Sequence, residues 1–222
     1  MSIKEYKSKK DYYFSNVRKE ILDLIPAKNS NANMLEIGAG SGDTLLYAKQ
    51  NAYAKYISGI ELCKIDESHQ ESEEFSNFII GDIENIVLPF ENKTFDVIIC
   101  GDVLEHLVNP YAVVEKLKKL LKDDGVIIVS LPNIRQIYIL KDIVFKGDFK
   151  YEDAGILDRT HLRFFCKKNM IDLFESNNLS VSKIISNSNL IGKTTKLINK
   201  FTFNLFDEFL AAQYYLVVEQ KC

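Results

Sequence analysis

The sequence predicts an α/β protein with a doubly wound, mostly parallel sheet. Apolar runs of strand length alternate with longer amphipathic stretches, which is the pattern of repeated βα units. The glycine-rich segment 38–42 lies between the first apolar run and an amphipathic stretch, where a doubly wound sheet binds adenosine-containing ligands. The 222 residues suit a single domain, with 1–30 as an N-terminal cap helix and 132–165 as an insertion that covers the site.

Each predicted strand is followed by turn or helix signals. Strands are predicted at 34–37, 56–61, 78–80, 95–100, 125–131, 181–185 and 214–218. The clearest helix runs from Tyr111 to Lys122, because its leucine and valine side chains share one face and its lysines cover the other. Further helices are predicted at 17–25 and 168–176, and His69 is predicted to lie in an exposed acidic helix without a role in the site.

Composition excludes several classes of protein. With 46% hydrophobic and 27% charged residues, the chain is typical of a globular protein and not of a disordered one. A net charge of -3 gives no general attraction to duplex nucleic acid. No apolar run approaches the roughly 20 residues of a membrane span, and the first ten residues lack the apolar run of a secretory signal. Four scattered cysteines indicate reduced thiols, so a cytoplasmic location is expected.

The glycine-rich segment has the spacing G-x-G-x-G from Gly38 to Gly42. The dinucleotide fingerprint requires a third glycine where this chain has Asp43. Glu36, two residues before the first glycine, would repel a pyrophosphate and suits a cationic ligand. These features disfavour a nicotinamide-dependent oxidoreductase, although a glycine-rich turn without a ligand is the simpler alternative.

Two more carboxylates follow the next two strands on the same edge of the sheet. Glu61 ends the second strand, where it can accept ribose hydroxyl protons, and Asp82 ends the third, where it can accept a hydrogen bond from an adenine amino group. Either residue alone could be a solvated turn acid. With Glu36, the three acids in register predict an adenosyl-ligand site.

These residues resemble the class I S-adenosylmethionine-dependent methyltransferases over essentially the whole chain. The resemblance implies a seven-stranded Rossmann-like sheet in the order 3-2-1-4-5-7-6 with an antiparallel last strand. It also implies S-adenosylmethionine as donor and S-adenosylhomocysteine as product. The segment Lys122-Asp123-Asp124-Gly125 departs slightly from the Pro-Gly-Gly that often follows the fourth helix. The implied cofactor-binding residues are Glu36, Gly38, Ala39, Gly40, Gly42, Glu61, Leu62, Gly81, Asp82, Ile83 and Asp102.

The predicted catalytic residues are Asp102 and His106, which follow the fourth strand, and His161 in the insertion. A hydroxyl acceptor benefits from a base or a metal, and a histidine could act as general base. Alternatively, Asp102, Glu105, His106 and His161 could bind a divalent metal, or these side chains could form salt bridges that fix the loops. A similar acid-x-x-Glu-His arrangement with a later histidine occurs in small-RNA 2'-O-methyltransferases and quinone-biosynthesis O-methyltransferases.

The predicted acceptor-binding residues are Tyr13, Asn133, Arg159 and Arg163. The arginines could bind a carboxylate or phosphate of the acceptor, or pair with nearby acids. Tyr13 could instead belong to a helix-packing surface. Segment 155–165 also resembles methyltransferases found with sugar-transferring enzymes of bacterial surface-glycan pathways.

The expected reaction is methyl transfer to a small-molecule or glycan-type acceptor, at a hydroxyl oxygen rather than at nitrogen or carbon, by a monomer or homodimer. A catalytically silent S-adenosylmethionine-binding scaffold is the main alternative to an enzyme, because the donor motifs alone do not require turnover.

Overall fold

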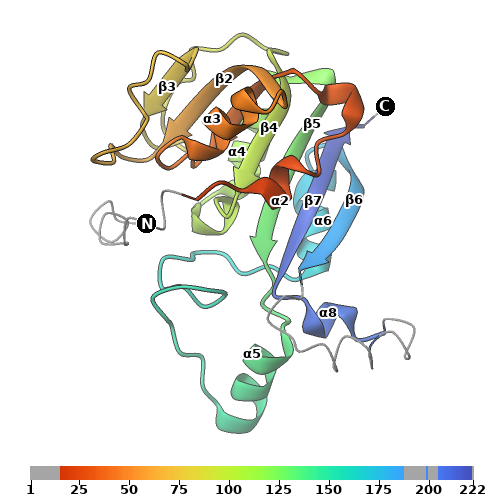
Figure 1. Ribbon diagram of the computed structural model, residues 1–222. Helices are drawn as coiled ribbons and strands as arrows, with labels where there is room; N and C mark the ends of the chain where they lie inside the picture. The colour runs from red at the N-terminus through yellow and green to blue at the C-terminus, as the bar shows by residue number, and fades with distance from the viewer. Residues whose placement is uncertain (1–15, 188–198, 200–204, 222) are drawn as a thin grey trace.

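The computed structural model describes residues 16–187, 199 and 205–221. Its centre is a seven-stranded sheet in the order β3-β2-β1-β4-β5-β7-β6 (Figure 1). All strands run parallel except β7, which pairs antiparallel with β5 and β6. The predicted fold class and strand order are therefore confirmed. The strands are β1 Ala32–Ile37, β2 Ala54–Glu61, β3 Asn77–Ile80, β4 Phe95–Gly101, β5 Leu121–Pro132, β6 Leu179–Asn187 and β7 Gln213–Gln220.

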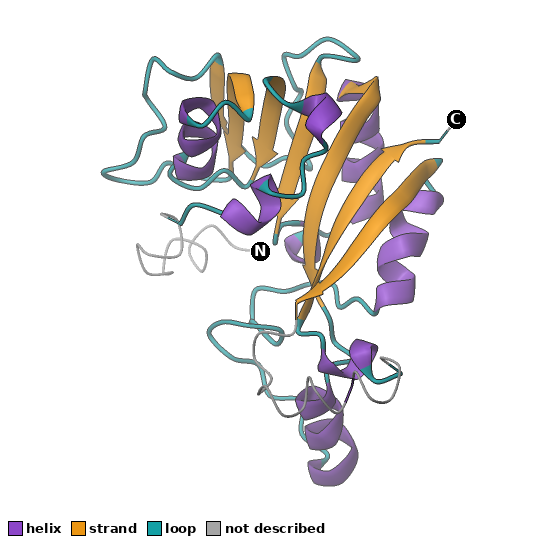
Figure 2. Ribbon diagram, turned by 45° about the vertical axis from the view of Figure 1, so that its right-hand side comes forward, coloured by secondary structure: helices purple, strands orange, loops and turns teal. Residues whose placement is uncertain are grey.

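Helices cover both faces of this sheet (Figure 2). Residues of α2 Lys19–Leu22 and α3 Asp43–Gln50 belong to one hydrophobic core, and residues of α4 Pro110–Leu120 and α6 Lys167–Glu175 belong to the other. Strands buried on both faces read as continuous apolar runs, which explains why β4 and β5 were clear in the sequence.

Most element boundaries lie within a few residues of the predictions. Asn109 begins α4 by accepting a hydrogen bond from the backbone N–H of Ala112, and Pro110 takes the first helical position. The helix ends before the predicted Leu121 and Lys122, because Leu121 already pairs with Phe95 of β4. Of the predicted cap helix 1–30, the structure describes the part from residue 16 onward. That part contains the short helix α2, Lys19–Leu22.

The predicted helix around His69 is wrong. Residues 62–76 form turns, and Gln70 is buried among them. The Gln70 amide donates hydrogen bonds to the carbonyls of Gly40, at 2.9 Å, and Cys63, at 3.4 Å. These two hydrogen bonds hold the segment against the glycine loop, where it forms turns instead of a helix.

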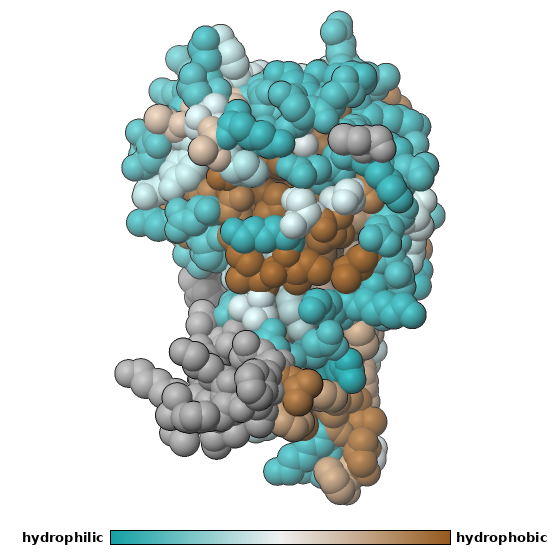
Figure 3. Space-filling model, turned by 90° about the vertical axis from the view of Figure 1, so that its right-hand side faces the viewer, coloured by the Kyte–Doolittle hydropathy of each residue, from teal (hydrophilic) through white to brown (hydrophobic). Residues whose placement is uncertain are grey.

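The insertion 132–165 projects beyond the carboxyl ends of the strands (Figure 1). It carries α5 Ile137–Lys141 and a π-helical turn at Asp142–Lys146. Hydrophobic side chains gather on this projecting end (Figure 3), with Val144 69% and Phe145 81% exposed. Among the described helices, none is long and apolar enough to cross a bilayer. A second short helix, α8 Asp207–Leu210, precedes β7.

Gly59 of β2 permits close packing behind the glycine loop. A Cβ at this position would lie 2.7 Å from Phe78 Cε2 and 3.1 Å from the Cβ of Ala39. We expect Gly59→Ala to lower the free energy of unfolding by about 1–3 kcal/mol, because the ring and the loop must shift. Urea unfolding measures this change. Lys55→Ala, at an exposed position of the same strand, should change stability by less than about 0.5 kcal/mol, and equal stabilities of both variants would contradict the packing argument.

Candidate functional site

A cavity of about 420 Å³ lies at the carboxyl ends of β1 and β4. Most predicted cofactor-binding residues line it, whereas Gly42, Glu61 and Gly81 are not among its lining residues. The lining residues are Asn16, Arg18, Glu36, Gly38, Ala39, Gly40, Thr44, Leu62, Asp82, Ile83, Glu84, Gly101, Asp102, Val103, His106 and Leu107. The β3-β2-β1-β4 order brings these segments together.

The glycine loop is held open by the backbone conformation and by Glu61. Gly38 and Gly40 have φ of +69° and +56°, a region that glycine adopts without strain. The buried Glu61 carboxylate accepts hydrogen bonds from the N–H groups of Gly40, at 2.8 Å, and Leu62, at 2.7 Å. Glu61 therefore lies behind the loop and fixes its shape, and its predicted contact with a ribose stays a prediction.

Glu36 is a buried acid in the wall of the cavity. It is 4% exposed, and its Oε2 atom has no hydrogen-bond partner among the described residues. Burial raises the pKa of Glu36 to about 8, against the opposing effect of Arg18. A ligand that brings a positive charge here would stabilise the ionised form.

Arg18 and Asp102 form a partly buried ion pair in the cavity that Glu36 also lines. Arg18 Nη2 lies 2.9 Å from Asp102 Oδ2 and donates a hydrogen bond of 3.2 Å to Ser130 Oγ. Asp102 also accepts hydrogen bonds from Ser130 Oγ, at 2.8 Å, and from the Gln213 side chain. Among the described lining residues, Arg18 is the one side chain with a permanent positive charge, so it is suited to bind an anionic group.

The opposite end of the cavity carries Leu62, Asp82 and Ile83. The two carboxylate oxygens of Asp82 accept hydrogen bonds from the backbone N–H of Glu84, at 2.9 Å, and from the Asn85 side chain, at 2.7 Å. This arrangement orients the acid beside two apolar side chains, a combination that suits a flat, partly polar ring.

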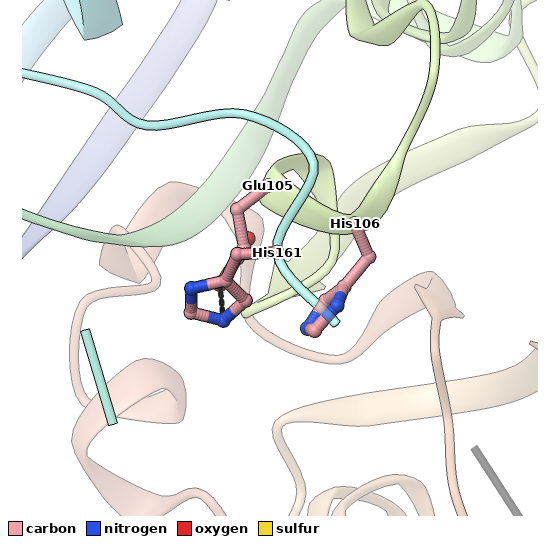
Figure 4. Close-up of side chains that lie close together, drawn as sticks. All are labelled: Glu105, His106 and His161. Carbon is pink, nitrogen blue, oxygen red and sulfur yellow. Dashed lines mark ion pairs between the residues drawn. The ribbon is translucent and has the colours of Figure 1, made fainter. Parts of the chain in front are cut away.

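Glu105, His106 and His161 converge beside this cavity (Figure 4). Glu105 and His106 belong to the short 3-10 helix Leu104–His106 after β4, and His161 belongs to the insertion. The two imidazole rings pack edge to face with centroids 4.7 Å apart, and His161 Nε2 lies 3.9 Å from Glu105 Oε1. Asp102 is not part of this cluster, because a turn with φ of +56° places it with Arg18 instead.

The backbone sets the orientation of both histidines. His106 Nδ1 lies 3.0 Å from the carbonyl oxygen of Thr160, and His161 Nδ1 lies 3.0 Å from that of Ile156. Because a carbonyl oxygen only accepts hydrogen bonds, each Nδ1 carries a proton, and the neutral form of each ring has its lone pair on Nε2. The chain therefore presents two nitrogen donors next to a carboxylate.

Burial controls the charge of this cluster. It raises the pKa of Glu105 well above its usual range, with a further contribution from Asp102. Burial, together with the neighbouring His161, lowers the pKa of His106 to about 4. His106 is therefore neutral near physiological pH.

The three described acceptor-binding candidates have separate partners. Asn133 is fully buried and donates hydrogen bonds to the carbonyls of Glu208 and Ala211. Arg159 pairs with Asp153, as one of the alternatives anticipated, and Arg163 donates to the carbonyl of Val108. Tyr13 lies outside the described residues. Contact of these four residues with an acceptor stays a prediction.

Sequence reasoning missed several residues that shape the site. Arg18 belongs to no recognised motif, and it lies next to Asp102 only because the fold brings these two distant segments together. Asp158 is buried, and its Oδ1 accepts hydrogen bonds from both the N–H and the hydroxyl of Thr160, which position the carbonyl that holds His106. The D-x-T spacing is a local turn signal, but it gave no indication of this second role.

Comparison with known proteins gives consistent results. A family model described as a methyltransferase domain matches residues 10–184. A ubiquinone biosynthesis O-methyltransferase of Glaesserella parasuis is 28% identical over 108 residues, which cover 45% of each chain. The chain spans about half the length of the curated relatives it matches.

Solved structures share the fold. A SAM-dependent methyltransferase from Archaeoglobus fulgidus superposes with a TM-score of 0.64 at 17% identity, covering 95% of this chain and 97% of that one. The 1,6-didemethyltoxoflavin-N1-methyltransferase of Burkholderia thailandensis, solved with S-adenosylhomocysteine, has a TM-score of 0.65 at 11% identity and covers 98% and 84% of the two chains.

The raised pKa of Glu36 predicts that binding of S-adenosylhomocysteine releases a proton near neutral pH. Glu36 is mostly protonated in the unliganded cavity because its pKa is about 8, and an incoming ammonium group favours the ionised form. Calorimetry in two buffers with different ionisation enthalpies measures the protons released. Glu36→Gln keeps the shape of the side chain and should lose this release, whereas the same release from both proteins would contradict the assignment.

Proposed function

Because this chain belongs to the methyltransferase-domain family of class I S-adenosylmethionine-dependent enzymes, we propose that it transfers a methyl group to a hydroxyl oxygen of a small-molecule or glycan-type acceptor. The observation that carries the proposal is one cavity that reaches from Asp82 to Glu36 and Arg18 and is bordered by His106. Its acids and its cation suit a donor with both cationic and anionic groups.

The donor's own chemistry assigns the two ends of the cavity. The methionine end carries an ammonium group, a carboxylate and a sulfonium, so we place it at Glu36, Arg18 and the glycine loop, where opposite charges meet. The adenine ring then lies at Leu62, Asp82 and Ile83, and Glu61 behind the loop is within the segment that would hold the ribose.

Methyl transfer is an in-line displacement. A lone pair of the acceptor oxygen forms the C–O bond while the C–S bond breaks, and the electron pair of that bond stays on sulfur to give S-adenosylhomocysteine. The acceptor hydroxyl must also lose its proton. His106 and His161 are the proposed catalytic side chains for this step because each presents an Nε2 lone pair, and Asp102 would act by holding Arg18 in place.

Oxygen is the proposed acceptor atom for two reasons. A neutral hydroxyl gains more from neighbouring basic or metal-binding groups than an amine does, and this chain places three such groups together. Several distant relatives are named as O-methyltransferases. The insertion 132–165 would then form the acceptor side of the site, because it supplies His161 and its residues Leu162 and Arg163 bind the carbonyl of Glu105.

We expect His161→Ala to reduce methyl transfer by about 100-fold or more while S-adenosylhomocysteine affinity stays unchanged, because His161 is not among the described residues that line the cavity. Methyl-labelled S-adenosylmethionine with a set of phenols and sugars gives the turnover, and calorimetry gives the affinity. His69→Ala, at an exposed histidine outside the site, is the matched control.

Three results would contradict the proposal. Tight donor binding without transfer to any acceptor would indicate a silent scaffold. Affinity for a nicotinamide dinucleotide in place of S-adenosylhomocysteine would indicate redox chemistry. Equal loss of turnover and donor affinity in His161→Ala would show that segment 156–165 supports folding instead of catalysis.

A further inference from the structure

Four side chains that are distant in the sequence form one hydrogen-bonded network at the edge of the cavity. Arg18 and Asp102 line the cavity, whereas Ser130 and Gln213 are not among its lining residues. We propose that Ser130 and Gln213 are positioning residues, which act through Asp102 to hold the Arg18 guanidinium in the orientation that binds the donor's carboxylate. The ligand in this inference rests on the proposed function, and the inference adds what sets the selectivity for that carboxylate.

The ion pair between Arg18 and Asp102 does not by itself fix the guanidinium. The Arg18 side chain is 21% exposed and that of Asp102 is 33% exposed. An ion pair with such access to water contributes little net free energy, because holding two side chains in one geometry costs conformational entropy. Further contacts are therefore needed if a ligand is to meet the guanidinium in one orientation.

Ser130, near the end of β5, supplies three of these contacts. Its Oγ donates a hydrogen bond of 2.8 Å to Asp102 Oδ1 and accepts one of 3.0 Å from the Asp102 backbone N–H and one of 3.2 Å from Arg18 Nη2. The donor and both lone pairs of the hydroxyl are thus used. Ser130 is fully buried, and it supports Asp102 in a backbone conformation with φ of +56° that residues other than glycine seldom adopt.

Gln213, the first residue of β7, supplies a fourth contact. Its side-chain amide donates a second hydrogen bond to Asp102 Oδ1, while its Oε1 accepts one of 3.5 Å from Asn187 Nδ2. The same Asn187 amide donates to the hydroxyl of Tyr215 at 3.1 Å. These contacts orient the Gln213 amide with its donor toward Asp102. Because the amide is neutral, it engages Oδ1 without replacing Arg18 as the cation at Oδ2.

The network leaves one end of the guanidinium for a ligand. Arg18 Nε bonds to Glu20 at 2.9 Å, and Nη2 bonds to Asp102 and Ser130, whereas Nη1 forms no hydrogen bond among the described residues. Nη1 lies 3.1 Å from the point that a Cβ on Gly101 would occupy, and Gly101 lines the same cavity. A carboxylate that enters the cavity beside Gly101 would accept a charge-assisted hydrogen bond from Nη1.

Two ligands isolate the contribution of the carboxylate. One is S-adenosylhomocysteine, and the other is its decarboxylated analogue, which keeps the adenosine, the thioether and the ammonium group. We expect the wild-type full-length protein to prefer S-adenosylhomocysteine in calorimetry, and Arg18→Met to lose this preference. Gln213→Met keeps the length of the side chain and removes the amide, so it should lower the affinity for S-adenosylhomocysteine by about 10-fold and leave that for the analogue unchanged.

Gln220→Met is the matched control. Gln220 also belongs to β7, and its side-chain amide donates hydrogen bonds to the carbonyls of Lys118 and Leu121, which do not line the cavity. This variant should bind both ligands as the wild type does. Ser130→Ala should show the same selective loss as Gln213→Met.

The double variant of Arg18→Met and Gln213→Met tests whether Gln213 acts through Arg18. If it does, the double variant binds S-adenosylhomocysteine as Arg18→Met does, because residues of one network are not additive. The inference would be overturned if Gln213→Met weakens both ligands equally, keeps the wild-type preference, or adds its full loss to that of Arg18→Met. A wild type that binds neither ligand would show that the proposed function has failed, and the inference would fall with it.

Discussion

The burial of the Glu36 carboxylate is the constraint on which the cofactor site depends. Glu36 lies on β1, between β2 and β4, and is only 4% exposed. Arg18 opposes the rise in its pKa, but the guanidinium is already held by Asp102. A positive charge that a ligand brings would therefore favour the ionised acid. A donor that carries an ammonium and a sulfonium supplies this charge, and a pyrophosphate would not.

The short turn after β4 lies between the cofactor cavity and the cluster of Glu105, His106 and His161. Asp102, at the end of the strand, adopts a positive φ and faces Arg18, Ser130 and Gln213. The 3-10 helix that follows places Glu105 and His106 against the returning end of the insertion instead. The same few residues thus connect Asp102 in the cavity with the nitrogen and oxygen donors of the neighbouring cluster. Under the proposed function, methyl transfer would then need no large movement of the sheet.

The strands and the glycine loop could be predicted because their signals are local. The buried runs 97–100 of β4 and 126–129 of β5 are apolar throughout, and the spacing of Gly38, Gly40 and Gly42 marks the loop directly. The contributions of Arg18 and Gln70 could not be predicted, because each depends on contacts between segments far apart in the sequence. The sequence also grouped Asp102 with His106 because both follow the fourth strand, whereas the positive φ of Asp102 turns it away from His106 and toward Arg18.

A crystal structure of the protein with S-adenosylhomocysteine tests the central claim most directly. The account predicts the homocysteine ammonium group within hydrogen-bonding or water-bridged distance of Glu36, its carboxylate at Arg18, and the adenine ring between Ile83 and Leu62 near Asp82. Density for the ligand at any other place, or with the adenine ring at Glu36 and Arg18, would contradict it.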